Sequence, residues 1–114
     1  MMRWIVAVVL TVHGLIHLMG FAKAFGYAEV PQLTQPVSRE MGVLWLLAGL
    51  LVVASAVMVV ASPRSAWIVG AVALVISQAV ILSAWRDAWA GTIANLLLLL
   101  VVAHGWFTEG PHSF

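Results

Sequence analysis

Four long apolar segments limit what this chain can fold into more than any other feature of its sequence. They cover residues 4–25, 41–61, 66–85 and 88–107, and the last three contain no Asp, Glu, Lys or Arg. A helix needs about 20 residues to cross the roughly 30 Å hydrocarbon core of a bilayer, so each segment is long enough for one crossing. The short alternating pattern of transmembrane strands is absent. The sequence therefore predicts an all-α integral membrane protein, a four-helix transmembrane bundle.

Composition supports a lipid environment. Of the 114 residues, 64% are hydrophobic and 8% are charged, whereas about 25% of an average soluble domain is charged. A soluble domain of this size has too much surface for its volume to hide so many apolar side chains, and disordered chains have the opposite composition. We therefore expect the lipid bilayer to be the main partner of this protein.

The same totals exclude several classes of function. The chain has no cysteine, which excludes disulfides, thiolate metal sites and iron–sulfur clusters. The formal net charge is +1, so there is no basic surface for nucleic acid and no polybasic run for lipid head groups. Gly-rich phosphate loops and the Gly-x-Ser-x-Gly elbow of hydrolases are also missing from the sequence.

The connections between the segments predict a single transmembrane domain over residues 1–114. Gly26 can end the first helix in the left-handed conformation, and Ser62 followed by Pro63 matches an N-cap and the first helical position. Arg86 and Asp87 leave room only for a very tight turn, so the last two helices must be antiparallel neighbours. The expected helices cover approximately residues 3–25, 38–61, 64–85 and 88–107, and the loop long enough to fold over a site covers residues 26–36.

Aromatic and small residues agree with this layout. Trp4, Trp67 and Trp106 would lie near one membrane interface, and Trp85 and Trp89 near the other, which is the belt pattern of membrane proteins. Four crossings put both termini on one side, but the Lys and Arg counts of the two sides differ too little to predict which side is cytoplasmic. Small residues recur every seven positions, as in helices that pack closely in lipid: Gly42, Gly49, Ala56, Gly70, Ser77 and Ala84.

Polar side chains inside a membrane are costly and are candidate functional residues. His13 and His17 are four residues apart and therefore share one face of a helix. At a rise of about 1.5 Å per residue, His17, Gln78 and Asn95 fall at similar depths, and His13 is about 6 Å deeper. We expect these four side chains to converge in the half of the bundle nearer the first loop. His104 lies half a turn around its helix from Asn95 and near the opposite interface, so we expect it to be structural or incidental.

Three roles stay open for the convergent residues. Their amide and imidazole groups could hydrogen-bond between helices only to hold the bundle together. They could form a pocket for a polar head group, a quinone or a similar small molecule, with Lys23 and Glu40 standing above the pocket as further ligand-binding candidates. They could also bind a metal, because His13 and His17 have the His-x-x-x-His spacing that supplies two ligands to zinc or copper.

A metal site would be incomplete with the two histidines alone. Glu40 or a water molecule would have to supply the third ligand. One histidine could instead serve as a single axial ligand to haem or chlorophyll, whereas residues four apart on one helix are unable to occupy opposite faces of the same iron. No serine nucleophile has a carboxylate partner within the membrane segments, so no catalytic residue is assigned and enzymatic activity stays open.

The stretch from His13 to Gly26, His-Gly-Leu-Ile-His-Leu-Met-Gly-Phe-Ala-Lys-Ala-Phe-Gly, resembles the first helix of DoxX-like small bacterial membrane proteins. The run from Gly91 to Leu97 fits a closing helix of the same general type. The resemblance implies a four-helix protein of the bacterial inner membrane, linked to quinone-dependent oxidation and to redox or thiol stress. Because the chain has no cysteine, the thiol-oxidising branches of that superfamily are not supported.

Two function classes follow. In the first, the protein is redox-associated and its intramembrane pocket binds a quinone or another small ligand, which requires a pocket that opens on the side of the first loop. In the second, the protein is a non-catalytic subunit or scaffold of a larger membrane complex, with a membrane protein partner or a second copy of itself. The second class requires polar side chains fully paired with one another and a broad apolar lateral face.

Overall fold

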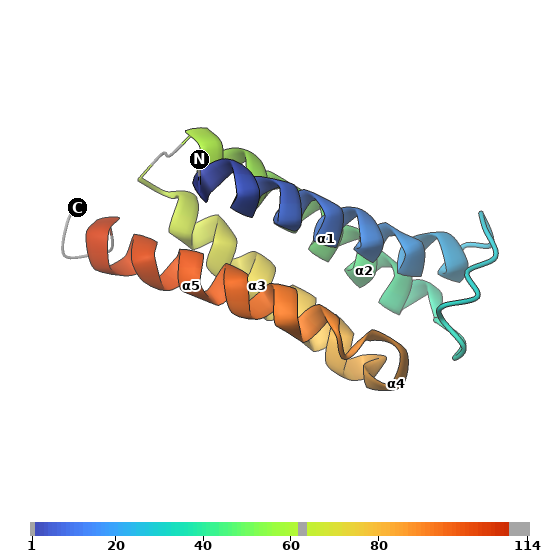
Figure 1. Ribbon diagram of the computed structural model, residues 1–114. Coiled ribbons are helices and arrows are strands. Elements are labelled where there is room, and N and C mark those ends of the chain that lie inside the picture. Colours follow the sequence, from blue (N-terminus) through green and yellow to red (C-terminus); the bar gives the residue numbers. More distant parts are fainter. Residues whose placement is uncertain (1, 62–63, 110–114) are drawn as a thin grey trace.

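Every element of secondary structure in residues 2–61 and 64–109, the part of the chain described by the computed structural model, is a helix. The molecule is a rod of 44 × 26 × 21 Å, and the long helices run along it, as Figure 1 shows. The helices are α1 (Met2–Ala24), α2 (Arg39–Ala61), α3 (Ala66–Ser83), α4 (Trp85–Ala88) and α5 (Gly91–Glu109). Four of them, all except α4, are long and apolar enough to cross a membrane. The predicted fold class, a four-helix transmembrane bundle, is therefore confirmed, and the chain is a multi-pass membrane protein.

The connection before the last helix differs from the prediction. Arg86 and Asp87 do not form a tight turn of their own; they lie in α4, a single helical turn, and the connection covers residues 84–90. The backbone leaves the helix at Ala84, with φ of −128°. The third helix also begins at Ala66 rather than at residue 64. The antiparallel arrangement of α3 and α5 is unaffected, whereas the predicted cap at Ser62 and Pro63 lies outside the described residues.

The end of α1 follows the prediction at Gly26. This glycine has φ of +73°, a left-handed conformation that strains residues with a Cβ atom. Its backbone N–H donates to the carbonyl of Lys23 at 3.2 Å, and the N–H of Tyr27 donates to the carbonyl of Ala22 at 2.9 Å. This pair of bonds is the Schellman motif. The Tyr27 ring then packs on Phe21, with 5.7 Å between centroids, so the chain turns sharply into the first loop.

Backbone contact holds α1 and α2 together. A Cβ atom added to Gly14 would lie 2.9 Å from the carbonyl oxygen of Gly49, and one added to Gly49 would lie 2.8 Å from that of Gly14. Only glycine permits such an approach, which is how small residues drive helix association in lipid. The helices then follow one another around the bundle, from α1 to α2, α3 and α5, and α5 packs only lightly against α1.

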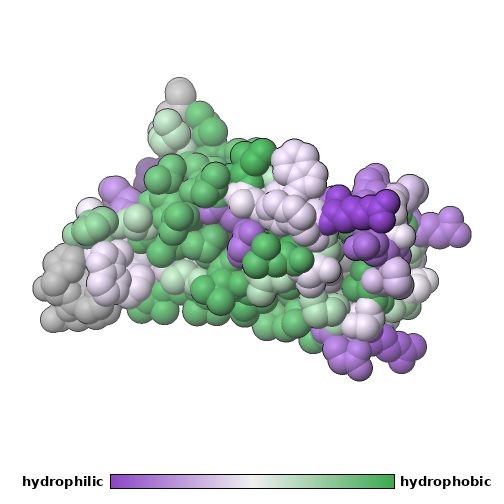
Figure 2. All heavy atoms as spheres, turned by 90° about the horizontal axis from the view of Figure 1, so that it is seen from below, coloured by the Kyte–Doolittle hydropathy of each residue, from purple (hydrophilic) through white to green (hydrophobic). Residues whose placement is uncertain are grey.

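The interior has two apolar parts with a polar layer between them. The larger part contains buried residues from all four long helices: Val6, Ala7, Leu10, Val52, Ala56, Ala73 and Leu98. The smaller part, near the first loop, contains Trp45, Ala48 and Val80. Figure 2 shows apolar surface over the middle of the rod and hydrophilic residues gathered at the end that carries the first loop and α4. This surface distribution fits a bundle that is surrounded by lipid.

Candidate functional site

Six polar side chains from α1, α3 and α5 form one hydrogen-bonded group, here called the polar cluster: His13, His17, Ser77, Gln78, Thr92 and Asn95. Asn95 is its centre. Oδ1 of Asn95 lies 2.9 Å from Nε2 of His13, and Nδ2 of Asn95 donates to Oε1 of Gln78 at 2.9 Å. Nδ2 also lies 3.1 Å from Oγ of Ser77. The predicted convergence of the two histidines with Gln78 and Asn95 is therefore confirmed.

His17 and Gln78 extend the polar cluster in opposite directions. Nδ1 of His17 lies 2.8 Å from the backbone carbonyl oxygen of His13, one turn earlier, and its Nε2 lies 2.7 Å from Oγ of Ser77. On the other side, Nε2 of Gln78 donates to Oγ1 of Thr92 at 3.1 Å. Because three helices contribute to the chain of bonds, the polar cluster connects α1 to the α3–α5 pair, and α1 and α5 otherwise pack only lightly against each other.

The positions of the protons in the polar cluster can be worked out from the backbone carbonyl of His13, because a carbonyl can only accept a hydrogen bond. A charged imidazole is costly at this depth, so both rings are treated as neutral, with one donor and one acceptor nitrogen each. The carbonyl of His13 only accepts, so Nδ1 of His17 donates to it and Nε2 of His17 accepts the Ser77 hydroxyl proton. Oγ of Ser77 then accepts from Nδ2 of Asn95. With the Asn95 amide in this orientation, its Oδ1 accepts from the Nε2–H of His13.

His13 is the histidine that keeps spare hydrogen-bonding capacity. With its proton on Nε2, its Nδ1 is an acceptor, and no hydrogen bond joins Nδ1 to any residue in the described part of the chain. Although Nδ1 has no hydrogen-bond partner among these residues, it is not fully enclosed by other atoms. It therefore stays accessible. Both ring nitrogens of His17 are already engaged. Therefore His13, rather than His17, can bind a further group without breaking a bond of the polar cluster.

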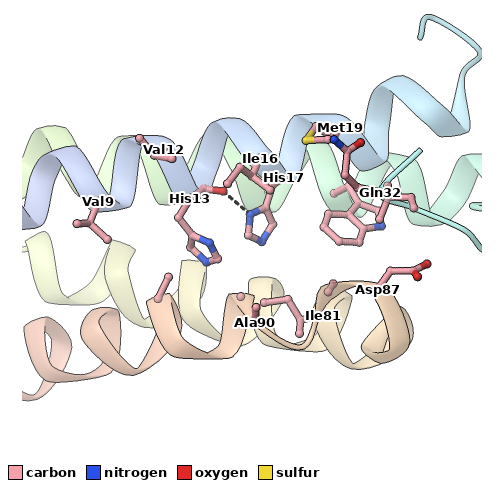
Figure 3. A pocket seen from close by; sticks show the side chains of 15 residues that line it. Val9, Val12, His13, Ile16, His17, Met19, Gln32, Ile81, Asp87 and Ala90 are labelled. Carbon is pink, nitrogen blue, oxygen red and sulfur yellow. Dashed lines mark hydrogen bonds between the residues drawn. The ribbon is translucent and has the colours of Figure 1, made fainter. Parts of the chain in front are cut away.

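A cavity of about 350 Å³ lies beside the polar cluster, between α1 and the start of α5. Figure 3 shows His13 and His17 projecting from α1 across this space toward the other helices. The lining is mostly apolar and consists of Val9, Val12, His13, Ile16, His17, Met19, Gln32, Leu33, Trp45, Ile81, Asp87, Ala88, Ala90, Gly91 and Ala94. We call it the lateral cavity, because its α1 wall includes the half-exposed, lipid-facing side chains of Val12 and Ile16.

Small residues on the α5 side explain why the lateral cavity exists. Ala90, Gly91 and Ala94 supply little side-chain volume where α5 faces α1. A Cβ atom on Gly91 would lie 2.8 Å from Cδ1 of Ile81 and 3.4 Å from Cε1 of His13, so this glycine also lets the α5 backbone approach the imidazole. The cavity is therefore formed by the choice of residues at the start of α5, and its wall there is backbone and methyl groups.

The first loop covers the outer end of the lateral cavity. Asp87 in α4 holds this loop: its Oδ1 accepts the Thr34 hydroxyl at 2.7 Å, and its Oδ2 accepts the backbone N–H of Thr34 at 2.9 Å and of Gln35 at 3.2 Å. These bonds, first of all that from the Thr34 hydroxyl, hold the pKa of the Asp87 carboxyl below its ordinary value. Gln32 and Leu33 of the same loop line the cavity.

Lys23 and Glu40 do not join the polar cluster. Nζ of Lys23 donates to the backbone carbonyls of Leu33 and Gln35, the latter at 2.7 Å, so this lysine fastens the loop. Glu40 is exposed at the start of α2 and is not in the lining of the lateral cavity. Whether either residue binds a ligand stays a prediction, but neither faces the space beside His13. His104 lies at the other end of the bundle, as its position in the sequence indicates.

The geometry offers little to a metal ion. Within residues 2–61 and 64–109, no three His, Asp or Glu side chains come together as a metal site. The rings of His13 and His17 are nearly perpendicular, with centroids 4.5 Å apart, and a metal shared by both would displace bonds that His17 already makes. Zinc, copper, haem and chlorophyll stay untested predictions, and the available nitrogen on His13 is the only imidazole nitrogen of the polar cluster that could bind one directly.

Ser77 and Thr92 are the members of the polar cluster that were not predicted. Ser77 was expected only as a small residue for close packing, yet its hydroxyl bridges His17 and Asn95. Ser77 is the residue before Gln78, and Thr92 precedes Asn95 by three positions, so its side chain lies on nearly the same helix face. Considering hydroxyl groups at the depth of the amides would have found both residues.

Comparison with protein families, with curated proteins and with solved structures found no match to this chain. The resemblance of residues 13–26 to DoxX-like proteins therefore stays a prediction. The polar cluster and the lateral cavity are the features from which a function has to be inferred.

Proposed function

We propose that this protein binds a small amphipathic molecule with a hydroxyl group, a reduced quinone being the favoured class, in the lateral cavity. The observation that carries the proposal is the accessible acceptor nitrogen of His13 at an apolar cavity beside the lipid-facing surface of α1. Ligand sites of this kind are apolar, with a few polar groups that orient the ligand. A hydroxyl group could donate to Nδ1 of His13, while the ring of the ligand would pack on Ile16 and Ile81.

Size agrees with this class of ligand, and access is beside α1 rather than on the side of the first loop, where the pocket was expected from the sequence to open. A volume of about 350 Å³ lies within the roughly 300–1,000 Å³ range of small-molecule sites. A quinone has a head group that exchanges hydrogen bonds and a tail that prefers lipid, and the exposed side chains of Val12 and Ile16 are where such a tail would leave the cavity. The resemblance to DoxX-like proteins supports the same class, and with it a place in the bacterial inner membrane.

The test compares two probes that share the ring and the tail, one with hydroxyl donors and one with methyl groups in place of the hydroxyl protons. The protein, in lipid nanodiscs under anaerobic conditions, is titrated with a decyl-substituted hydroquinone and with its dimethyl ether. We expect the hydroquinone to bind about tenfold more tightly, because one hydrogen bond to a buried acceptor has about that effect. His13→Phe should abolish the difference. The matched control is His104→Phe, the same substitution at the opposite end of the bundle, which should keep it.

Equal affinity for both probes in the unmodified protein would refute the role of His13 as an acceptor. The absence of binding by either probe would refute the proposed ligand class. A preference for the ether would contradict an acceptor at His13 and would mean that Asn95 has the opposite amide orientation, with His13 presenting a donor.

A structural subunit is the second candidate, and the completeness of the polar cluster favours it. Apart from Nδ1 of His13, the hydrogen-bonding groups of the polar cluster are largely paired with each other, from His17 at one end to Thr92 at the other. A cluster that serves only to lock helices requires such pairing. The span of α5 is also the least buried, with 11% of its residues inside the bundle. A single cysteine at Leu96, on this face, should then cross-link to a neighbouring chain in native membranes.

A further inference from the structure

A wall only one side chain thick separates the lateral cavity from a smaller cavity of about 210 Å³, here called the outer cavity. Leu33, Trp45 and Asp87 make up this wall, since they line both cavities. The rest of the outer cavity is lined by residues between positions 35 and 41 and by residues 83 and 84. It therefore lies at the end of the bundle that carries the first loop and α4, where Figure 2 shows hydrophilic residues.

The parts of this wall are held in place to different degrees. Trp45 is 4% exposed, and a Cβ atom on Gly20 would overlap its indole ring, so α1 packs directly on the ring and fixes it. Leu33 belongs to the first loop, is only half-buried and has a cavity on either side. A side chain with empty space on both sides loses few packing contacts when it moves. The loop is therefore the part of the wall that can open.

Hydrogen bonds from two charged side chains hold the loop at this place. Nζ of Lys23 donates to the carbonyls of residues 33 and 35, and the carboxylate of Asp87 accepts from residues 34 and 35. Among the described residues, the only backbone–backbone hydrogen bond of residues 28–37 joins the N–H of Leu33 to the carbonyl of Val30 at 3.0 Å, within the loop itself. Most of the bonds to Lys23 and Asp87 are exposed to water, where each contributes little and local opening is easy.

We propose that residues 32–35 of the first loop form a lid on the lateral cavity, and that Lys23 and Asp87 are the latch that keeps it closed. Opening joins the lateral cavity to the outer cavity and to the aqueous phase, while the side along α1 stays open to lipid. A ligand that enters from lipid then has its head group reached by water and protons only when the lid opens. This role rests on the proposed function, whereas the opening itself does not.

Labelling of a single cysteine measures the opening without any ligand. The chain has no cysteine, so Ala94→Cys gives one thiol in the lining of the lateral cavity. A charged, impermeant methanethiosulfonate is added to sealed vesicles on the side of the first loop. We expect labelling to be slow, and about tenfold faster when Asp87→Ala removes three bonds of the latch. Lys23→Met, which removes the other tie, should also speed labelling. The matched control is Arg86→Ala, the neighbouring residue in α4, which lines neither cavity and should leave the rate unchanged.

Three results would overturn the lid. Asp87→Ala and Lys23→Met could leave the labelling rate unchanged, or Ala94→Cys could label rapidly with the latch intact, which would mean that the cavity is always open to water. Ile93→Cys, on the 64% exposed neighbouring position, should stay unlabelled in lipid; labelling as fast as that of Ala94→Cys would mean that the reagent arrives through the membrane. Circular dichroism checks that the helices of each variant are intact. Failure of hydroquinone binding with labelling as expected would refute the proposed function alone, and the reverse outcome would refute the lid alone.

Discussion

Replacing Asn95 by leucine tests the polar cluster most directly, because one side chain makes bonds to three others. Asn95 is 3% exposed, and leucine fills a similar space while offering no donor or acceptor. The substitution would remove the bonds to His13, Ser77 and Gln78. It would leave three polar groups without their main partner in a region that contains little water.

The expected magnitude comes from measurements on other membrane proteins. Hydrogen bonds between transmembrane helices contribute about 0.6 kcal/mol on average and at most about 1.7 kcal/mol. Three such bonds therefore give a loss of about 2 kcal/mol in the free energy of unfolding, with an upper value of about 5 kcal/mol. The lower figure is the better expectation, because Gln78 is only half-buried and can turn toward Thr92.

The loss is measured by unfolding the protein in mixed micelles with increasing dodecyl sulfate, followed by circular dichroism. The control is Leu96→Ala, which changes the adjacent, 56% exposed position and should alter stability by less than about 0.5 kcal/mol. If Asn95→Leu lowers stability no more than this control, the polar cluster does not stabilise the bundle. The bonds would then have to be explained by ligand binding alone.

Two further predictions concern the connections at the two ends of the bundle, outside the four long helices. Because the chain has no cysteine, Gln32→Cys and Ser65→Cys each introduce a single thiol, and an impermeant reagent should label them from opposite sides of sealed vesicles; labelling from the same side would contradict the four-crossing topology. The lowered pKa of Asp87 means that the carboxylate keeps its bonds to Thr34 above the ordinary value of 3.8 and loses them only as pH falls through the lower folded-state value. An NMR titration of the Thr34 amide should accordingly have its midpoint below 3.8, and a midpoint at or above that value would contradict the loop contact.

Much of the site was predictable from two quantities, the length of each hydrophobic segment and the rise per residue of a helix. Hydrophobic length fixes where each helix enters and leaves the bilayer, and the constant rise per residue turns sequence position into depth. These two facts place His17, Gln78 and Asn95 at one level. In the structure Ser77 bridges His17 and Asn95, and Asn95 donates directly to Gln78. The prediction succeeded because a transmembrane helix has little freedom to shift along the membrane normal. Depth is therefore the coordinate that sequence determines best in such a protein.

The rotation of side chains around the helices was less predictable. Lys23 has the depth expected for a residue above the pocket, yet its amine turns to the loop carbonyls. The short helix α4 depends on how α3 ends at Ala84 and on the bonds that Asp87 makes to a loop more than 50 residues earlier in the chain. Both outcomes depend on contacts between distant segments, and no local pattern encodes those contacts.

The two histidines illustrate why position on a helix face does not determine function. They have the same residue type, lie one turn apart and line the same cavity, so the sequence treats them as equivalent. The carbonyl of His13 and the hydroxyl of Ser77 together engage both nitrogens of His17. Asn95 engages only one nitrogen of His13, and the small residues of α5 leave space beside the other. The same hydrogen bonds that lock the bundle through His17 therefore hold His13 with its remaining nitrogen available. The structural role and the proposed ligand-binding role of the polar cluster are thus compatible, because they concern different histidines.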